Sequence, residues 1–166
     1  MKSRFYIKCR AVPVGKAGPL VLRIEQDIRI ISATIAPTRG FPRGLNIDGL
    51  AIFDMQLDGR VDGIEILCPL GMDLSATKAF PRAREKYWKL ILDPSGKDII
   101  APDVEVVMHR LDRFLNIRFK DGNVDAKYLL GPGVTALVGA EELLGLQIEM
   151  VDFIWPDFET VFGVTK

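Results

Sequence analysis

His109 is the only histidine in the chain, and imidazole is the side chain best suited to acid–base chemistry near neutral pH. A serine hydrolase would need this imidazole next to a serine, because a serine hydroxyl becomes a good nucleophile only beside a base. The serines of the chain are Ser3, Ser32, Ser75 and Ser95. None of them stands in the Gly-x-Ser-x-Gly pattern of a nucleophile elbow. We also find no cysteine or carboxylate at metal-ligand spacing from His109, so we expect a structural or surface role for it and no metal site.

Other residues that could carry chemistry have simpler structural interpretations. Glu65 could act as an acid or base, but the matching residue later in the chain is Gln147, so we expect Glu65 to be a solvent-facing strand residue. Residues 131–133, Gly-Pro-Gly, lack the lysine and the spacing of a phosphate-binding loop and predict a turn. Cys9 and Cys68 are predicted to be buried thiols in a reducing compartment, with a disulfide or a reactive thiol as the alternative. We therefore predict a protein that is not an enzyme and holds no cofactor.

Arginines and aromatic residues gather in two segments of the chain, a loop over residues 37–44 and an amphipathic segment over residues 80–91. Arginine, tyrosine and tryptophan are typical anchors of protein interfaces. The predicted anchors are Arg39, Phe41, Arg43, Arg82, Arg84, Tyr87 and Trp88. A nucleic-acid site or a solvated basic face is the alternative, but 22 basic and 22 acidic residues give a formal net charge of zero. We therefore expect a protein partner with an acidic surface.

The overall composition predicts a globular protein. A chain of 166 residues with 48% hydrophobic residues can bury a substantial core. No apolar run approaches the roughly 18 residues of a membrane span, and the first residues lack an apolar signal core. We therefore expect a cytoplasmic protein without a membrane partner. We expect one compact unit in which residues 1–70 and 104–166 form similar parts, joined by a linker over residues 71–103.

Alternating and β-branched segments predict that the fold is mainly β. The predicted strands are residues 4–12, 20–24, 28–36, 49–57, 60–67, 104–111, 114–119, 124–130, 134–138 and 143–151. The dipeptides Asp58-Gly59 and Asp121-Gly122 predict hairpin turns of type I′, which need two positive φ angles in succession.

A single short helix is predicted over residues 81–91. Pro81 suits the first helical position, where its missing N–H group costs nothing. The apolar stripe of this helix would consist of Phe80, Ala83, Tyr87 and Ile91. Residues 87–92 could equally form a strand.

The two halves of the chain show a similar order of strands. The segments that align are residues 22–24 with 117–119, Asp27 with Asp121, residues 35–36 with 129–130, and residues 63–66 with 145–148. We interpret the similarity as a tandem duplication, with two meanders of independent origin as the alternative. A five-stranded sheet of this size cannot cover its own apolar face, so the two halves should pack face to face as a sandwich or as two half-barrels.

Two motifs resemble a known family. They are residues 58–67, Asp-Gly-Arg-Val-Asp-Gly-Ile-Glu-Ile-Leu, and residues 118–124, Arg-Phe-Lys-Asp-Gly-Asn-Val. Together they resemble the bacterial domain-of-unknown-function 2283 family over residues 4–67 and 104–151. The chain departs from the pattern where residues 26–28 and 141–142 replace Asp-Gly pairs. The family has no agreed activity, and its members can stand beside small toxin genes, which implies at most an antitoxin or immunity role.

These observations together predict a mainly β protein with a minor α+β character, in which two antiparallel β-meander repeats flank one short helix. The function we predict is binding of a protein partner, possibly a toxin domain whose active site the chain covers. The alternative is a small-molecule binder or an enzyme with a cleft between the two sheets. A filled core would favour the binding protein, and a deep pocket lined by His109 or by several carboxylates would favour the alternative.

Overall fold

The fold, given by a computed structural model, is mainly β in its described part, as predicted. The structure describes residues 7–14, 21–25, 30–35, 43–67, 87–93, 99–100, 107–111, 114–131 and 133–149. The strands are β1 Lys8–Val14, β2 Val21–Glu25, β3 Ile30–Thr34, β4 Arg43–Ile47, β5 Ala51–Met55, β6 Val61–Leu67, β7 Tyr87–Asp93, β8 Ile99–Ile100, β9 Val107–Leu111, β10 Phe114–Arg118, β11 Ala126–Gly131, β12 Val134–Gly139 and β13 Glu142–Glu149. Each predicted strand overlaps one of these. No helix in these ranges has the length and hydropathy needed to cross a membrane.

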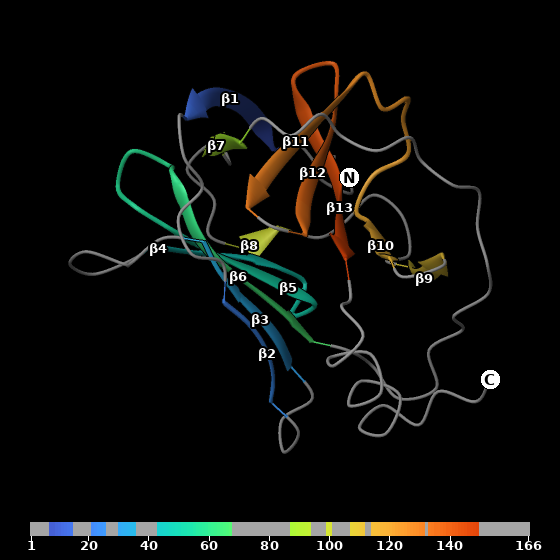
Figure 1. Cartoon of the computed structure of the whole chain (residues 1–166). Coiled ribbons are helices and arrows are strands. Elements are labelled where there is room, and N and C mark those ends of the chain that lie inside the picture. Colours follow the sequence, from blue (N-terminus) through green and yellow to red (C-terminus); the bar gives the residue numbers. More distant parts are fainter. Residues whose placement is uncertain are drawn as a thin grey trace.

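The strands form two sheets (Figure 1). The first sheet has the order β2-β3-β6-β5-β4-β8, in which only β8 runs parallel to its neighbour. The second sheet has the order β1-β7-β11-β12-β13-β10-β9. Because β1 also pairs with β13, through Lys8 and Glu142, five strands of the second sheet close into a barrel from which β10 and β9 extend.

The strands β2 to β6 and β9 to β13 are connected in the same order and paired in the same register, except for a shift between Leu129 and Gly131 of β11 that has no counterpart in β4. In the first set Asp54 pairs with Gly63, and in the second set Leu137 pairs with Gly145. Both pairs are followed by a register shift, which leaves one residue of β6 and one residue of β13 without a partner. The parallel pairs β4–β8 and β11–β7 also begin at corresponding positions of the two sets. Residues of the two sets can therefore be compared position by position.

This correspondence corrects most of the sequence alignment between the two halves. Residues 63–66 and 145–148 do occupy corresponding positions, in β6 and β13. Residues 22–24 lie in β2, however, which corresponds to β9 and not to the strand that contains residues 117–118. Ile35 follows β3, whose counterpart is β10 and not β11. The sequence alignment of the two halves matched the wrong strands because neighbouring strands share the same apolar alternation. This alternation alone does not determine which strand of one half corresponds to which strand of the other.

The hairpin predicted at Asp58-Gly59 is present, although its turn is not of type I′, and the hairpin predicted at Asp121-Gly122 is wrong. Strands β5 and β6 do pair across Asp58-Gly59, but of these two residues only Gly59 has a positive φ, of 85°. Strands β10 and β11, on either side of Asp121-Gly122, are not neighbours in the sheet. The type I′ requirement is met at residues 48–49, where φ is 48° and 71°, between the neighbouring strands β4 and β5.

The predicted helix over residues 81–91 is wrong where the structure describes it, and the alternative of a strand is correct. Residues 87–93 form β7, which pairs with β1 along its whole length. Leu90 and Leu92 are buried, whereas Lys89 and Asp93 are exposed, and this period of two is the period of a strand. Residues 81–86 and the predicted boundaries at 70–71 and 103–104 lie outside the described residues.

Buried side chains from both sheets form one hydrophobic cluster. Phe53 of β5 and Phe119, which follows β10, meet edge to face with ring centroids 6.2 Å apart. Outside the core the sheets are joined where Arg60 bridges to Ile91 and where the Leu92 N–H donates to the Gly59 carbonyl at 2.9 Å. The described buried side chains of the two sheets therefore pack together in one core.

Candidate protein-binding face

The strands β1 and β7 present one broad surface that faces away from the core. Alternation along each strand buries Cys9, Leu90 and Leu92 and turns the residues between them outward. We call this outward surface the β1–β7 face. It consists of the register pairs Lys8 with Asp93, Arg10 with Ile91, Val12 with Lys89 and Val14 with Tyr87.

A groove of about 300 Å³ adjoins this face at the connection between β5 and β6. Its lining residues are Arg10, Arg43, Met55, Gln56, Leu57, Asp58, Gly59, Ile91, Leu92 and Asp93. Leu57, at the tip of the connection, is 91% exposed and adds apolar surface to the groove. The connection lies so close to β7 that a Cβ atom on Gly59 would be 2.3 Å from the Leu92 carbonyl oxygen. The exposed leucine is therefore presented from a well-anchored turn.

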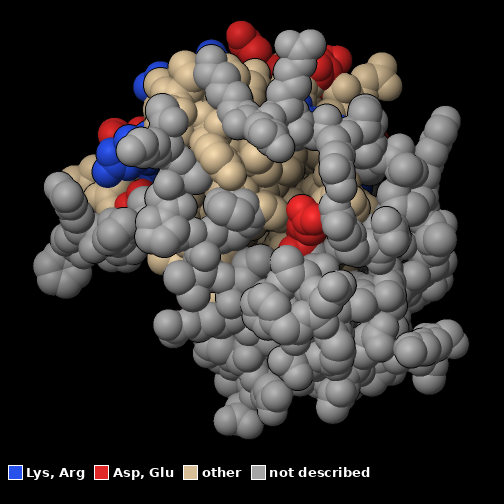
Figure 2. All heavy atoms as spheres, viewed as in Figure 1, with Lys and Arg blue, Asp and Glu red and all other residues tan. Residues whose placement is uncertain are grey.

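Basic side chains outnumber acidic ones on the face and in the groove. Figure 2 shows Lys and Arg side chains, with acidic side chains beside them, at the side of the molecule where the β5–β6 connection lies in Figure 1. The basic residues are Lys8, Arg10, Arg43 and Lys89, and the acidic residues are Asp58 and Asp93. Val12, which is 37% exposed, and Leu57 add apolar area between these charges. Such a mixture suits a partner surface that is acidic around an apolar patch.

Two aspartates of the β5–β6 hairpin, Asp54 and Asp62, lie in the strands next to the groove. Asp62 is the unpaired residue of the β6 bulge and is only 2% exposed. Its carboxylate accepts a hydrogen bond from the Gln56 amide and lies 3.6 Å from Nε of Arg60. Partial burial, together with the charge of Asp62, raises the pKa of Asp54. Asp62 holds Arg60 against the hairpin, so we do not count Arg60 among the partner-binding residues.

The structure places the predicted anchors differently from one another. Arg43 lines the groove, and Tyr87 lies on the β1–β7 face, so these two share one side of the molecule. Trp88 lies on the opposite side of β7 and packs edge to face on Tyr128, with ring centroids 5.0 Å apart. The remaining predicted anchors lie outside the described residues, and they are Arg39, Phe41, Arg82 and Arg84.

Sequence reasoning missed the basic residues of β1 and the exposed Leu57. The signal for β1 was present, because Lys8 and Arg10 fall on one side of an alternating segment and Ile7 and Cys9 on the other. No comparable signal marked Leu57, since a single leucine in a turn is compatible with burial or exposure.

Of the residues considered for catalysis, Ser3, Ser75 and Ser95 lie outside the described residues, and the structure does not pair His109 with Ser32 or Glu65. His109 lies in β9, at the edge of the second sheet, where it pairs in register with Asn116. Ser32 and Glu65 pair with each other in the first sheet. Within the described ranges, no group of three histidine, cysteine or acidic residues is arranged to hold a metal ion.

Cys9 is a free thiol in the buried wall of the barrel. Burial, with the negative charges of Glu142 and Glu141, raises its pKa to about 12. Its thiolate is therefore scarce at neutral pH. Cys68 lies outside the described residues.

No protein-family model matches the chain, and no curated protein sequence matches it either. The resemblance to the domain-of-unknown-function 2283 family therefore depends on the sequence motifs at residues 58–67 and 118–124 alone.

Proposed function

We propose that this chain is a non-enzymatic protein-binding module that neutralises its partner, an immunity or antitoxin protein, by covering the partner's active site. The observation that carries the proposal is the combination of exposed Val12 and Leu57 with the basic residues around them, on the β1–β7 face and in its groove. Apolar anchors surrounded by charged residues are typical of specific protein interfaces.

The rigidity of the face supports this proposal. A strand of seven residues is about 23 Å long, so β1 and β7 side by side cover roughly 220 Å², and an ordinary interface of about 800 Å² per partner would extend from them over the adjoining groove and beyond. The face belongs to a closed barrel and lies over a continuous core. A surface held in this way loses little conformational entropy on binding.

We also propose that the fold arose by tandem duplication of a five-stranded antiparallel unit. This unit is not the predicted meander, because β3 pairs with β6 and β10 with β13. The supporting observations are the same strand order, and the same position of the bulges in β6 and β13, in β2 to β6 and β9 to β13. Such a duplication would be consistent with the family resemblance of residues 58–67 and 118–124. In this interpretation one copy forms an open sheet, and the other closes into the barrel that carries the β1–β7 face.

The test is to co-purify the chain with the products of genes adjacent to its own and to ask whether it restores growth when such a product is toxic. We expect a stable complex and rescue of growth. Failure of both with every adjacent product would remove the proposal.

Variants of the chain then locate the interface. Leu57→Ser should weaken the complex by at least about tenfold, because the most exposed apolar anchor is lost. Leu67→Ser is the matched control, since Leu67 is also an exposed leucine, at 41%, but lies at the end of β6 outside the face and the groove. Arg10→Glu should slow association and reduce its dependence on salt. Equal effects of the two leucine variants would contradict the assignment of the face.

A further inference from the structure

One edge of β1 has no pairing strand beyond Cys9 in the described part of the chain. β1 pairs with β7 along its whole length, whereas its other edge pairs in register with β13 only at Lys8. We call this short contact between β1 and β13 the seam. At its end the Cys9 N–H donates to the Glu141 carbonyl at 2.8 Å. Residues 10–14 therefore form an open edge, and β1 lies at the upper rim of the molecule in Figure 1.

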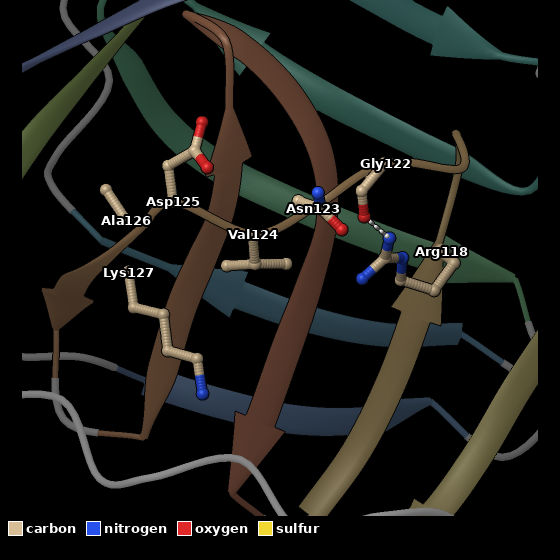
Figure 3. A pocket seen from close by; sticks show the side chains of 7 residues that line it. All are labelled: Arg118, Gly122, Asn123, Val124, Asp125, Ala126 and Lys127. Carbon is tan, nitrogen blue, oxygen red and sulfur yellow. Dashed lines mark hydrogen bonds between the residues drawn. The ribbon is translucent and has the colours of Figure 1, made fainter.

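A tight turn between β12 and β13 ends the seam. Ala140 and Glu141 have φ angles of 50° and 61°, and two positive φ angles in succession are typical of a type I′ turn. The chain therefore turns back into β12 at the point where further pairing with β1 would begin. The Ala140 N–H donates to the Asp125 carboxylate at 2.9 Å, and Asp125 lines a groove beside this hairpin in Figure 3. This bond holds the turn, so the open edge is a fixed feature of the fold.

The pairing with β7 determines which backbone groups of β1 point to the open edge. Because the Cys9 N–H is used in the seam, Cys9, Ala11 and Pro13 direct their backbone groups away from β7. Arg10 and Val12, between them, direct theirs into the ladder with β7. Ala11 therefore presents one N–H donor and one carbonyl acceptor at the open edge. Pro13 presents a carbonyl group but has no N–H group to offer.

The open edge continues the β1–β7 face. Arg10, Val12 and Pro13 are exposed, and Ala11 is half-buried. Arg10 and Val12 carry their side chains on the face itself. A strand added at the open edge would place alternate side chains beside these two residues, because opposite residues of paired strands point to the same side of a sheet. The added strand would therefore enlarge the contact that the face makes.

Pro13 restricts what can pair with the open edge. A proline on an edge strand opposes indiscriminate pairing, because it removes a backbone donor. It also disfavours a second copy of this chain. Antiparallel pairing of two β1 strands about Ala11 would place Pro13 of each copy opposite Cys9 of the other, whose N–H is already used in the seam. Only the two Ala11 residues would then exchange bonds, so a segment of another protein is the better occupant.

We propose that the partner of this chain adds an extended segment to the open edge of β1, as one more strand centred on Ala11. The proposal rests on the proposed function, because the segment belongs to the protein that the β1–β7 face binds. The segment exchanges two backbone hydrogen bonds with Ala11. Its residue beside Arg10 is acidic and its residue beside Val12 is apolar, which are the favourable cross-strand pairs for these two side chains.

Amide hydrogen exchange followed by NMR tests the proposal, on the free chain and on its complex with the adjacent gene product that it retains. In the free chain the Ala11 amide should exchange faster than the amides of Arg10 and Val12, which are bonded to β7. In the complex, exchange at Ala11 should slow by about 100-fold or more, because its N–H is then bonded to the added strand. Slow exchange at Ala11 in the free chain, or unchanged exchange in the complex, would overturn the proposal.

A proline variant separates strand addition from simple contact with the face. Ala11→Pro removes the edge donor and places the proline ring where the added strand would lie, without breaking a bond to β7. β1 already holds a proline at the equivalent position, Pro13. The variant should weaken the complex by about tenfold or more. Ala11→Ser is the matched control, since it keeps the N–H group, and it should bind as tightly as the unmodified chain.

The outcomes distinguish this proposal from the proposed function. Equal binding by Ala11→Pro, in a complex that still depends on Leu57, would overturn strand addition and leave the protein-binding function standing. Absence of any complex with an adjacent gene product would overturn both. Should Ala11→Pro fail to fold, which its circular dichroism would show, the exchange of Ala11 in the unmodified chain decides the question.

Discussion

The edge-to-face contact between Phe53 and Phe119 is the most direct test that the two sheets share one core. Both side chains are completely buried, and the planes of their rings are inclined by 73°. Replacing either ring by leucine keeps the site apolar and removes the aromatic contact. Each single variant should lower the free energy of unfolding by about 1–2 kcal/mol, mostly through lost contacts and a small cavity.

The two effects should not be additive. An edge-to-face pair contributes about 0.5–1.5 kcal/mol beyond its buried area, so the double variant should lose that much less than the sum of the single variants. Urea denaturation followed by far-UV circular dichroism measures the three losses, and each variant should unfold in one transition. As a control, Phe53→Leu combined with Trp88→Leu should be additive, because Trp88 packs on Tyr128 instead. Additivity of the Phe53 and Phe119 variants, or separate unfolding of two parts, would refute a shared core.

Three further predictions concern packing and titration. Gly145→Ala should cost about 1–3 kcal/mol in urea denaturation, because its Cβ would lie 2.1 Å from the Ile117 carbonyl oxygen. Gly44→Ala, whose Cβ would have 4.0 Å of clearance, should change stability by less than about 0.5 kcal/mol. Asp54→Asn should raise the melting temperature at pH 7, since partial burial raises the pKa of the aspartate and disfavours its charged form. That gain should vanish below pH 3.8, where the folded and unfolded chains are both protonated at this position, and a gain that persists there would contradict the cause given. In a variant whose other cysteine is serine, Cys9 should resist iodoacetamide at pH 8 until the chain unfolds, because its pKa is raised to about 12.

Most of the strands were predictable from sequence because many of them carry an apolar alternation. The alternation of β3 and β5 survives in the structure as a strict exchange of buried and less buried residues. The apolar alternation of the sequence could not predict which strands that are distant in the chain pair with each other. Hairpin rules join neighbours along the chain, whereas β3 pairs with β6 and β10 with β13. For this reason the Asp121-Gly122 hairpin was predicted wrongly.

Local composition misled the prediction at two other places. The strand β4 was missed because Arg43 and Gly44 follow a segment rich in glycine and proline, which predicts a loop. The strand β7 was assigned to a helix because Pro81 and a stripe of large apolar residues fit a helical period. Pairing with β1 over seven residues decides in favour of the strand, and that pairing is a property of the fold rather than of the segment.

The candidate face was predictable only in part. Arg43 and Tyr87 were expected to bind a partner because of their residue types, and both lie on the side of the molecule that carries the face and its groove. The contribution of Arg10 depends on the pairing of β1 with β7, which joins residues about 80 positions apart in the chain. Neither composition nor spacing could have indicated that these two strands lie together.

Methyl NMR of the chain, with and without the adjacent gene product that it retains, tests the proposed function most directly. We expect the methyl resonances of Val12, Leu57 and Ile91 to shift or broaden in the complex, because these side chains lie on the β1–β7 face or in its groove. The exposed methyl groups of Leu67, outside the face, should keep their positions. Changes at Leu67 with none at the other three residues would contradict binding through the β1–β7 face.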